Sequence, residues 1–157
     1  MASEPDPGHR RCYVASPLGF NDAGRCYYRE HYLPALETVV RPIDPWAMVN
    51  ADDIAQAKAE GRLRQLWLDV GQRNLDAIAS CDVLVAWLDG QEVDSGTATE
   101  IGYAAGRGIR CFGLRSDLRQ AGEEDMVVNV QVEATVVSTG GRVAASLSDL
   151  VALLTDL

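Results

Sequence analysis

The chain has 157 residues, a length that fits one domain able to bury a full core. A hydrophobic fraction of 47% is typical of a globular protein, and a formal net charge of −9 argues against binding to a nucleic-acid backbone or an anionic membrane surface. Residues 1–10 are polar and lack the apolar run of a signal peptide, and no stretch approaches the ~18 apolar residues of a membrane span. We therefore expect a loose N-terminal tail over residues 1–10 and one cytoplasmic domain over residues 11–157.

Strands and helices alternate along the first half of the chain. The expected order is a strand over 12–16, a helix over 22–40, a short strand over 41–43 and a helix over 52–60. Pro34 lies inside the first helix and predicts a kink or an early end there. The clearest helical periodicity follows, carried by Leu63, Leu66, Trp67, Val70, Leu75 and Ile78. This pattern predicts that Trp67 belongs to the core, and we expect the same of Trp87.

The second half continues the alternation. The expected elements are a buried strand over 83–88, a polar loop over 89–96, a helix over 97–106, a strand over 109–114, a charged loop over 115–125, a strand over 134–138 and a helix over 146–157. Such alternation predicts an α/β fold, a single-domain flavodoxin-like (Rossmann-like) five-stranded parallel sheet with helices on both faces. Ligands bind such sheets beyond the carboxyl ends of the strands, near the switch point of the strand order. Loops 17–22 and 89–96 are therefore the places to look for function.

The cysteines and histidines exclude several chemistries. The four cysteines form no C-x-x-C pair, and the two histidines are nowhere near metal-ligand spacing. Three of the cysteines, Cys12, Cys81 and Cys111, lie in or beside predicted strands and are expected to be buried and reduced. We expect no metal site, no cofactor and no Ser-His-Asp triad.

The acidic loop and the helix after it hold the most informative residues. Asp89, Asp94 and Glu100 bring carboxylates to the end of a buried strand, and Gly90 and Gly96 let the backbone turn tightly beside a ligand. In the expected first helical turn, the helix dipole favours an ionised Glu100, which can attack an electrophilic carbon. The same residues allow a structural alternative. Thr97 and Glu100 have the spacing of a capping box, and the two aspartates suit Asx turns.

Three stretches together suggest a family. They are Asp89-Gly90 with Asp94-x-Gly96-Thr97 and Glu100-x-Gly102-Tyr103-Ala104, then Tyr13-x-Ala15-Ser16-Pro17, and Asn74-Leu75-x-x-Ile78-x-x-x-Asp82. In this pattern the chain resembles the nucleoside 2-deoxyribosyltransferase family from about Arg11 to Leu114. The resemblance implies a retaining double displacement in which Glu100 attacks C1′ of the deoxyribose. It further implies that Asp94 contacts the nucleoside and that Asp89 assists proton transfer, and we expect Tyr13 to hydrogen-bond Glu100.

The substrate-binding residues expected from this resemblance lie on several elements. Ser16, Pro17 and Phe20 follow the first strand, and Gly96 opens the helix of Glu100. Phe20 and Trp46 either stack on the ligand or pack as ordinary loop residues. Asn74, on the apolar stripe of its helix, either binds nearby backbone or reaches the base of the ligand. Some family members carry aspartate at the position of Asn74, so a role in protonation does not transfer directly.

The resemblance leaves three functions open. The first is transfer of deoxyribose between nucleobases, with a small-molecule nucleoside and a free nucleobase as partners. The second is hydrolysis of nucleoside 5′-monophosphates, and family members with that activity often have serine in place of Asp94. The third is a non-catalytic nucleotide sensor on the same fold. We also expect a homo-oligomer, because Met126–Val130 is too apolar for water and the family shares active sites between subunits. Asn129 is the residue expected to reach a neighbouring site.

Overall fold

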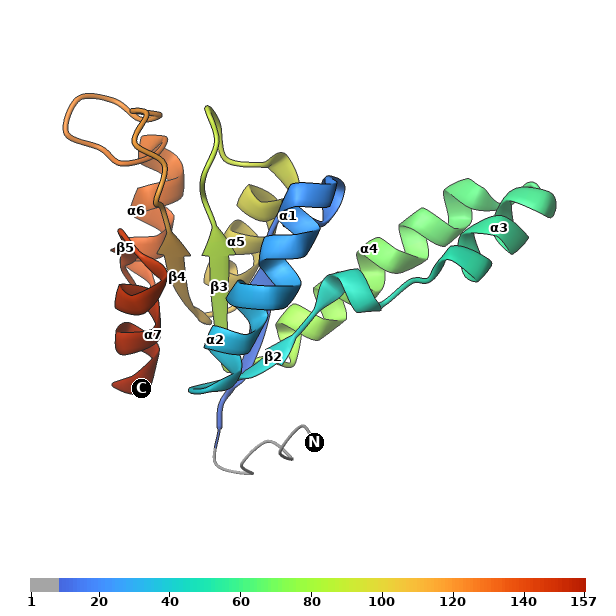
Figure 1. Ribbon diagram of the computed structural model, residues 1–157, viewed down its shortest axis with the longest axis horizontal. Coiled ribbons are helices and arrows are strands. Elements are labelled where there is room, and N and C mark those ends of the chain that lie inside the picture. The colour runs from blue at the N-terminus through green and yellow to red at the C-terminus, as the bar shows by residue number, and fades with distance from the viewer. Residues whose placement is uncertain (1–8) are drawn as a thin grey trace.

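The architecture is a five-stranded, all-parallel sheet with helices on both faces (Figure 1). The structure, a computed structural model, describes residues 9–157. The strand order is β2-β1-β3-β4-β5, the flavodoxin-like order predicted from the sequence. The strands are β1 (Arg11–Ala15), β2 (Arg41–Ile43), β3 (Val83–Trp87), β4 (Arg110–Leu114) and β5 (Val143–Ala144). Because the chain turns to opposite sides after β1 and β3, the switch point lies between these two central strands.

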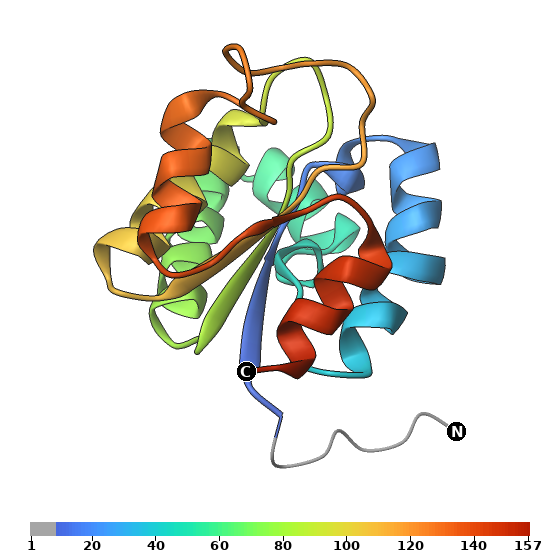
Figure 2. The ribbon, with the colours of Figure 1, turned by 90° about the vertical axis from the view of Figure 1, so that its left-hand side faces the viewer.

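Each face of the sheet is covered by its own set of helices (Figure 2). Alternate residues of β1 show the division: Cys12 and Val14 pack into one cluster, whereas Tyr13 and Ala15 pack into the other. The first cluster is closed by the helical segment that follows β1 and by α7 (Leu147–Thr155). The second is closed by α4 (Leu63–Ala79), α5 (Ser95–Gly106) and α6 (Val130–Ser138). All three of the cysteines expected to be buried are buried.

The predicted helix over 22–40 is a continuous but irregular helical segment. It consists of α1 (Asp22–Tyr27), a π-helical turn η2 (Tyr28–Tyr32) and α2 (Leu33–Glu37). The π turn comes just before Pro34, where the missing N–H already interrupts the hydrogen-bond ladder. The interruption predicted at Pro34 is therefore a widened turn, and the helix ends three residues earlier than expected.

The predicted strand over 134–138 is wrong, because these residues belong to helix α6. The run of valines favours a strand by propensity. Its arrangement suits a helix instead, because Val132 and Val136 are four residues apart and pack together in one core cluster. A helix is also what connects two parallel strands, and the fifth strand is β5, beyond the Gly140-Gly141 turn. Tertiary packing thus outweighs local β-propensity here.

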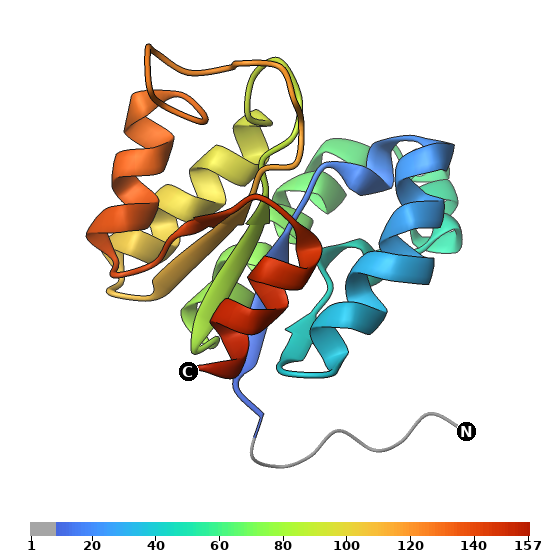
Figure 3. The same ribbon diagram turned by 60° about the vertical axis from the view of Figure 1, so that its left-hand side comes forward.

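The segment between β2 and β3 forms a separate side of the molecule. A short 3-10 turn η3 (Pro45–Ala47) leads to α3 (Ala51–Ala59), which begins with a capping box between Asn50 and Asp53. Helix α4 then returns the chain to the sheet, and the α3–α4 pair projects beyond the edge of the sheet in Figures 1 and 3. Within residues 9–157, no helix has the length and apolar character needed to cross a membrane.

Candidate active site

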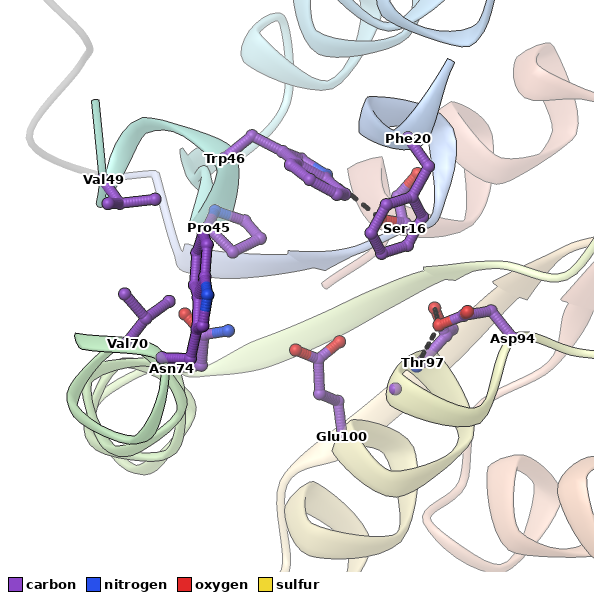
Figure 4. A pocket seen from close by; sticks show the side chains of 12 residues that line it. Ser16, Phe20, Pro45, Trp46, Val49, Val70, Asn74, Asp94, Thr97 and Glu100 are labelled. Atoms are coloured by element: carbon purple, nitrogen blue, oxygen red, sulfur yellow. Dashed lines mark hydrogen bonds between the residues drawn. The ribbon is translucent and has the colours of Figure 1, made fainter. Parts of the chain in front are cut away.

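A cavity of about 230 Å³ lies at the carboxyl edge of the sheet, beside the switch point. It is slightly smaller than typical ligand pockets of ~300–1,000 Å³, so it suits a small ligand. Residues from the loop after β1, from η3, from α4 and from the start of α5 meet around it (Figure 4). The lining residues are Ser16, Phe20, Pro45, Trp46, Val49, Trp67, Val70, Asn74, Asp94, Gly96, Thr97 and Glu100.

Glu100 extends from α5 into the middle of this cavity (Figure 4). Its Oε1 accepts a hydrogen bond of 2.6 Å from the Tyr13 hydroxyl, as the sequence predicted. Tyr13 lies on β1 and has no exposed surface, so its ring fixes the position of the Glu100 carboxyl. The capping-box alternative is wrong, because α5 begins at Ser95 and Asp94 caps it. Glu100 therefore lies in the second turn of the helix, where the free N–H groups of the terminus no longer reach it.

The environment of Glu100 favours the protonated carboxyl more than the sequence suggested. Burial raises the pKa of Glu100 to about 7, the hydrogen bond from Tyr13 lowers it, and the negative charge of Asp94 raises it. Tyr13 remains a hydrogen-bond donor, because burial and the facing Glu100 hold the pKa of its phenol well above the usual range. Carboxyls with a pKa near neutrality in a cleft are frequent in catalytic sites.

Asp94 forms the wall next to Glu100 and begins the helix that carries it. Its Oδ2 accepts hydrogen bonds from the Thr97 backbone N–H at 3.0 Å and the Thr97 hydroxyl at 3.3 Å. No hydrogen bond among residues 9–157 ends on Oδ1 of Asp94, so this atom is available to a ligand. A Cβ on Gly96 would lie 3.0 Å from Oδ2, so a side chain there would crowd the carboxylate.

An aromatic wall formed by Phe20 and Trp46 lies across the cavity from Glu100 (Figure 4). The two rings meet edge to face with centroids 4.8 Å apart, and Phe20 is 71% exposed. The indole N–H of Trp46 donates to the Ser16 carbonyl at 3.1 Å, which leaves the apolar surface of the ring to line the cavity. Only glycine fits at position 19, because a Cβ there would lie 2.2 Å from the Trp46 ring.

Trp46 is held by a side chain that the sequence did not single out. Asp44 Oδ1 accepts hydrogen bonds of 2.9 Å from both the Trp46 backbone N–H and the Tyr28 hydroxyl. Tyr28 is buried and belongs to the π-helical turn, so this turn supports the aromatic wall. Asp44 and Tyr28 are sixteen residues apart, so no local sequence pattern predicts the bond between them.

Helix α4 provides the end of the cavity opposite Asp94. Asn74 lies there with Val70, and its buried Oδ1 has no hydrogen-bond partner among residues 9–157. An amide left in this state favours the ligand-contacting interpretation of Asn74 over the structural one. The prediction that Trp67 belongs to the core is wrong, because it is 46% exposed and lines the cavity. Periodicity places Trp67 on the apolar stripe, but α4 projects from the sheet and leaves that end of the stripe uncovered.

Four of the predicted site residues do not line this cavity: Tyr13, which reaches it only through Glu100, and Asp89, Pro17 and Asn129. Asp89 accepts three hydrogen bonds from Ser116 and Asp117, in the loop after β4. Pro17 precedes the 3-10 turn η1 (Leu18–Phe20) without lining the cavity, whereas Ser16 lines it. Asn129 is exposed and caps α6 by accepting from the Gln131 N–H at 3.0 Å. Among residues 9–157, no three His, Cys, Asp or Glu side chains are grouped to hold a metal ion.

The cavity, with its central carboxyl and aromatic wall, lies at the switch point, the place where α/β proteins of this architecture bind small ligands. The sequence model of the nucleoside 2-deoxyribosyltransferase family matches residues 12–140, and the chain belongs to this family. No curated protein sequence matches the chain.

Three solved structures show the same fold. A conserved protein from Enterococcus faecalis V583 is 23% identical, with a TM-score of 0.67 over 95% of this chain and 99% of its own. A 2-deoxyribosyltransferase from Bacillus psychrosaccharolyticus is 16% identical, with a TM-score of 0.63 over 89% of each chain. A CMP N-glycosidase from Clostridium botulinum is 16% identical, with a TM-score of 0.54 over 94% of this chain and 100% of its own. At these identities the likeness shows the fold alone.

Proposed function

We propose that this protein transfers 2-deoxyribose between nucleobases through a covalent intermediate on Glu100. The observation that carries the proposal is the 2.6 Å hydrogen bond that holds Glu100 Oε1 on the buried Tyr13 hydroxyl inside the cavity. A nucleophile needs a fixed direction of attack, and a rigid tyrosine provides it. Membership of the nucleoside 2-deoxyribosyltransferase family supports the same reaction.

The reaction proceeds in two displacements at C1′ of the sugar. In the first, an oxygen of ionised Glu100 forms a bond to C1′ while the glycosidic C–N bond breaks, and the base leaves with the electron pair and takes a proton from water. In the second, a ring nitrogen of another base attacks C1′ from the vacated face, gives its proton to water, and releases Glu100 as a carboxylate. Both transition states resemble an oxocarbenium ion, and two inversions retain the configuration.

The neighbours of Glu100 fit this sequence. The Tyr13 hydroxyl donates to the carboxylate and stabilises it each time it is released. The negative charge of Asp94 favours the positive charge that develops on the sugar ring, and its free Oδ1 is available to a sugar hydroxyl. The Trp46–Phe20 wall and Asn74 then remain for the base.

The second candidate is hydrolysis of a nucleoside 5′-monophosphate, the substrate type named for the Clostridium botulinum structure. The charge of the cavity argues for the uncharged nucleoside. None of the twelve lining residues carries a positive charge, and Asp94 and Glu100 are acidic. A phosphate dianion in such a site meets only like charge. We expect faster turnover of deoxycytidine than of cytidine or deoxycytidine monophosphate, and faster cleavage of the monophosphate contradicts the nucleoside assignment.

One assay separates the three functions. The protein is incubated with deoxyinosine and free adenine or cytosine, and the exchanged nucleoside is measured. Exchange identifies a transferase, whereas release of free sugar without acceptor identifies a hydrolase. Absence of both reactions across the common deoxynucleosides and their monophosphates leaves only the sensor.

A second experiment tests the covalent step. A 2-fluoro-2-deoxy-arabinosyl nucleoside is expected to leave a sugar adduct on Glu100, visible by intact mass spectrometry.

A homo-oligomer with shared sites is part of the proposal. Val127 and Val130 are each 45% exposed on either side of the exposed Asn129, whereas Val128 is buried in its own domain. An apolar pair beside a polar side chain suits a symmetric contact. Light scattering is expected to show at least a dimer at micromolar concentration. Exchange of subunits between inactive Glu100→Ala and inactive Asn129→Ala proteins is expected to restore part of the activity, and no recovery after proven exchange contradicts the sharing of sites.

A further inference from the structure

The loops that follow β3 and β4 are tied together by side chains that the proposed reaction does not use. Arg115 is only 6% exposed and directly follows β4. Its Nη1 donates to the carbonyls of Leu88 and Gly90, each at 2.7 Å, and its Nη2 donates to the Arg119 carbonyl at 2.7 Å. One guanidinium therefore joins the start of the acidic loop to the loop after β4.

Asp89 makes the reciprocal contacts from the acidic loop. Its Oδ1 accepts from the backbone N–H groups of Ser116 at 2.6 Å and Asp117 at 2.9 Å, and its Oδ2 accepts from the Ser116 hydroxyl at 2.6 Å. The Gly90 N–H adds a longer bond of 3.3 Å to Asp117 Oδ2. We call Arg115 and Asp89, with the groups they bind, the loop latch. Each side of the latch satisfies backbone groups of the other loop.

The chemistry of Arg115 points to a positioning role. Its guanidinium is buried, and in the described part of the chain it forms no ion pair. The charge of Arg115 is partly compensated by nearby Asp117, whose pKa is lowered by Arg119 and, to a lesser extent, by Arg115. The Nη1 and Nη2 of Arg115 reach three carbonyls with one planar fork, a feature that lysine cannot reproduce, whereas its buried Nε has no partner among residues 9–157. A hydrophobic side chain would leave those carbonyls without their donor. The position thus specifies both the charge and the shape of arginine.

Only three residues, 91–93, separate the latch at Gly90 from Asp94. Val93 packs against the core, and Asp94 caps α5 and lines the cavity, so the acidic loop is held at both ends. Gly90 has a φ of +132°, which a side chain would strain, so the turn between the latch and Asp94 is also defined. Displacement of residues 88–90 is therefore transmitted over a short segment to the carboxylate beside Glu100.

We propose that Arg115 and Asp89 are positioning residues that hold Asp94 at its place in the active site, and that Asp89 does not transfer protons. The effect of these two residues on turnover rests on the proposed function, whereas their effect on the position of the loop does not. The positioning role replaces the role in proton transfer that the family resemblance implied for Asp89. The Asp89 carboxylate is directed to the loop after β4 and not to the cavity.

The first test measures the loop itself. Hydrogen–deuterium exchange of peptides covering residues 89–98 is compared between wild type, Arg115→Lys and the surface control Arg142→Lys, well below the melting temperature. Exchange in this segment is expected to rise at least ~5-fold in Arg115→Lys, with peptides of α7 unchanged as the internal reference. Unchanged exchange over residues 89–98 overturns the latch, whether or not the protein turns over nucleosides.

The second test separates the roles of Asp89. Asp89→Asn keeps an acceptor for the N–H groups of residues 116 and 117 but cannot transfer a proton, whereas Asp89→Ala removes every acceptor. We expect Asp89→Asn to keep kcat/KM within about 3-fold of wild type and Asp89→Ala to lose at least ~10-fold. A loss of ~10²-fold or more in Asp89→Asn is the size expected for a missing acid–base group and overturns the proposal.

The third test links the latch to Asp94. The charged and titratable groups that face Glu100 are Tyr13 from β1 and Asp94 from the start of α5. Glu100 must be ionised to attack, so kcat/KM is expected to rise with pH as Glu100 loses its proton. A displaced Asp94 raises the pKa of Glu100 less, so Arg115→Lys is expected to move this rise, the acid limb of the profile, to lower pH. Asp94→Asn is expected to do the same, and the double variant to show no further shift. If the pH shifts of the two single variants add in the double variant, Arg115 does not act through Asp94. If Arg115→Lys only lowers the melting temperature and leaves the pH profile unchanged, the role of Arg115 is structural.

If wild type shows no reaction with any nucleoside or nucleotide while Arg115→Lys frees the loop, the proposed function fails and the latch stands. If wild type turns over deoxynucleosides and the variant frees the loop without changing kcat/KM or its pH profile, the proposed function stands and the positioning role fails.

Discussion

The two sides of the cavity differ in how they are built. The α5 side is local: Asp94, Gly96, Thr97 and Glu100 lie within seven consecutive residues, and the helix itself sets their spacing. The opposite side consists of residues that are distant in the sequence. Trp46 follows β2, and Trp67 and Asn74 lie on α4. A tyrosine of the π turn supports Trp46 through Asp44. The proposed chemistry is thus concentrated in one short segment, whereas the surface proposed for the base depends on the packing of several elements.

The largest expected effect tests the α5 side. Glu100→Ala removes the proposed nucleophile, and we expect kcat to fall by ~10³-fold or more. Because Asp94, and not Glu100, caps α5, the variant should remain folded. Turnover and circular dichroism are measured on the same preparation. Near-full activity in a folded variant refutes the nucleophile.

The opposite wall should affect binding more than chemistry. Trp46→Ala removes the face expected to stack on the base, worth ~1–3 kcal/mol, so KM should rise about 10- to 100-fold with a smaller change in kcat. Trp46→Phe keeps an aromatic ring but loses the bond to the Ser16 carbonyl, and serves as the matched variant. An equal loss of kcat in both variants would mean that the wall positions the nucleophile and not the base.

The pH profile compares the two neighbours of Glu100. Since the nucleophile must be ionised, kcat/KM of wild type should rise with pH and level off above about 7, the pKa of Glu100. Tyr13→Phe removes the bond that lowers this pKa, so the acid limb should move to higher pH. Asp94→Asn removes the charge that raises it, so the limb should move to lower pH. Shifts in the same direction from both variants contradict this arrangement.

The smallest effect is on stability. The pKa of Glu100 is raised by folding, so the folded state binds its proton more tightly than the unfolded chain and loses stability as pH rises from about 4.5 to about 7. Glu100→Gln never ionises and escapes this loss. Its free energy of unfolding should exceed that of wild type by roughly 1–3 kcal/mol at pH 8, and the two should be nearly equal at pH 4. Thermal melts at both values measure the difference, and a variant less stable at pH 8 contradicts the burial argument.

The same contrast explains what could be predicted. The alternation of strands and helices, the flavodoxin-like order and the acidic segment are local patterns, and the sequence was sufficient for them. The Tyr13–Glu100 pair was also predicted, together with the family resemblance of the first strand and the acidic loop. The error at residues 134–138 arose because the preference of valine for strands was weighed without the need for a helix between two parallel strands.

By itself, the sequence determined the family, the parallel sheet and the residue proposed to attack the sugar, since each follows from local patterns of residues along the chain. Only the tertiary structure decided where Trp67 lies, how Asp44 and Tyr28 support Trp46, and that Asp89 faces the loop after β4. These contacts join residues far apart in the chain, and their geometry is set by how helices and loops pack on the sheet. The raised pKa of Glu100 has the same origin, because burial is a property of the assembled site and not of the helix that carries the glutamate.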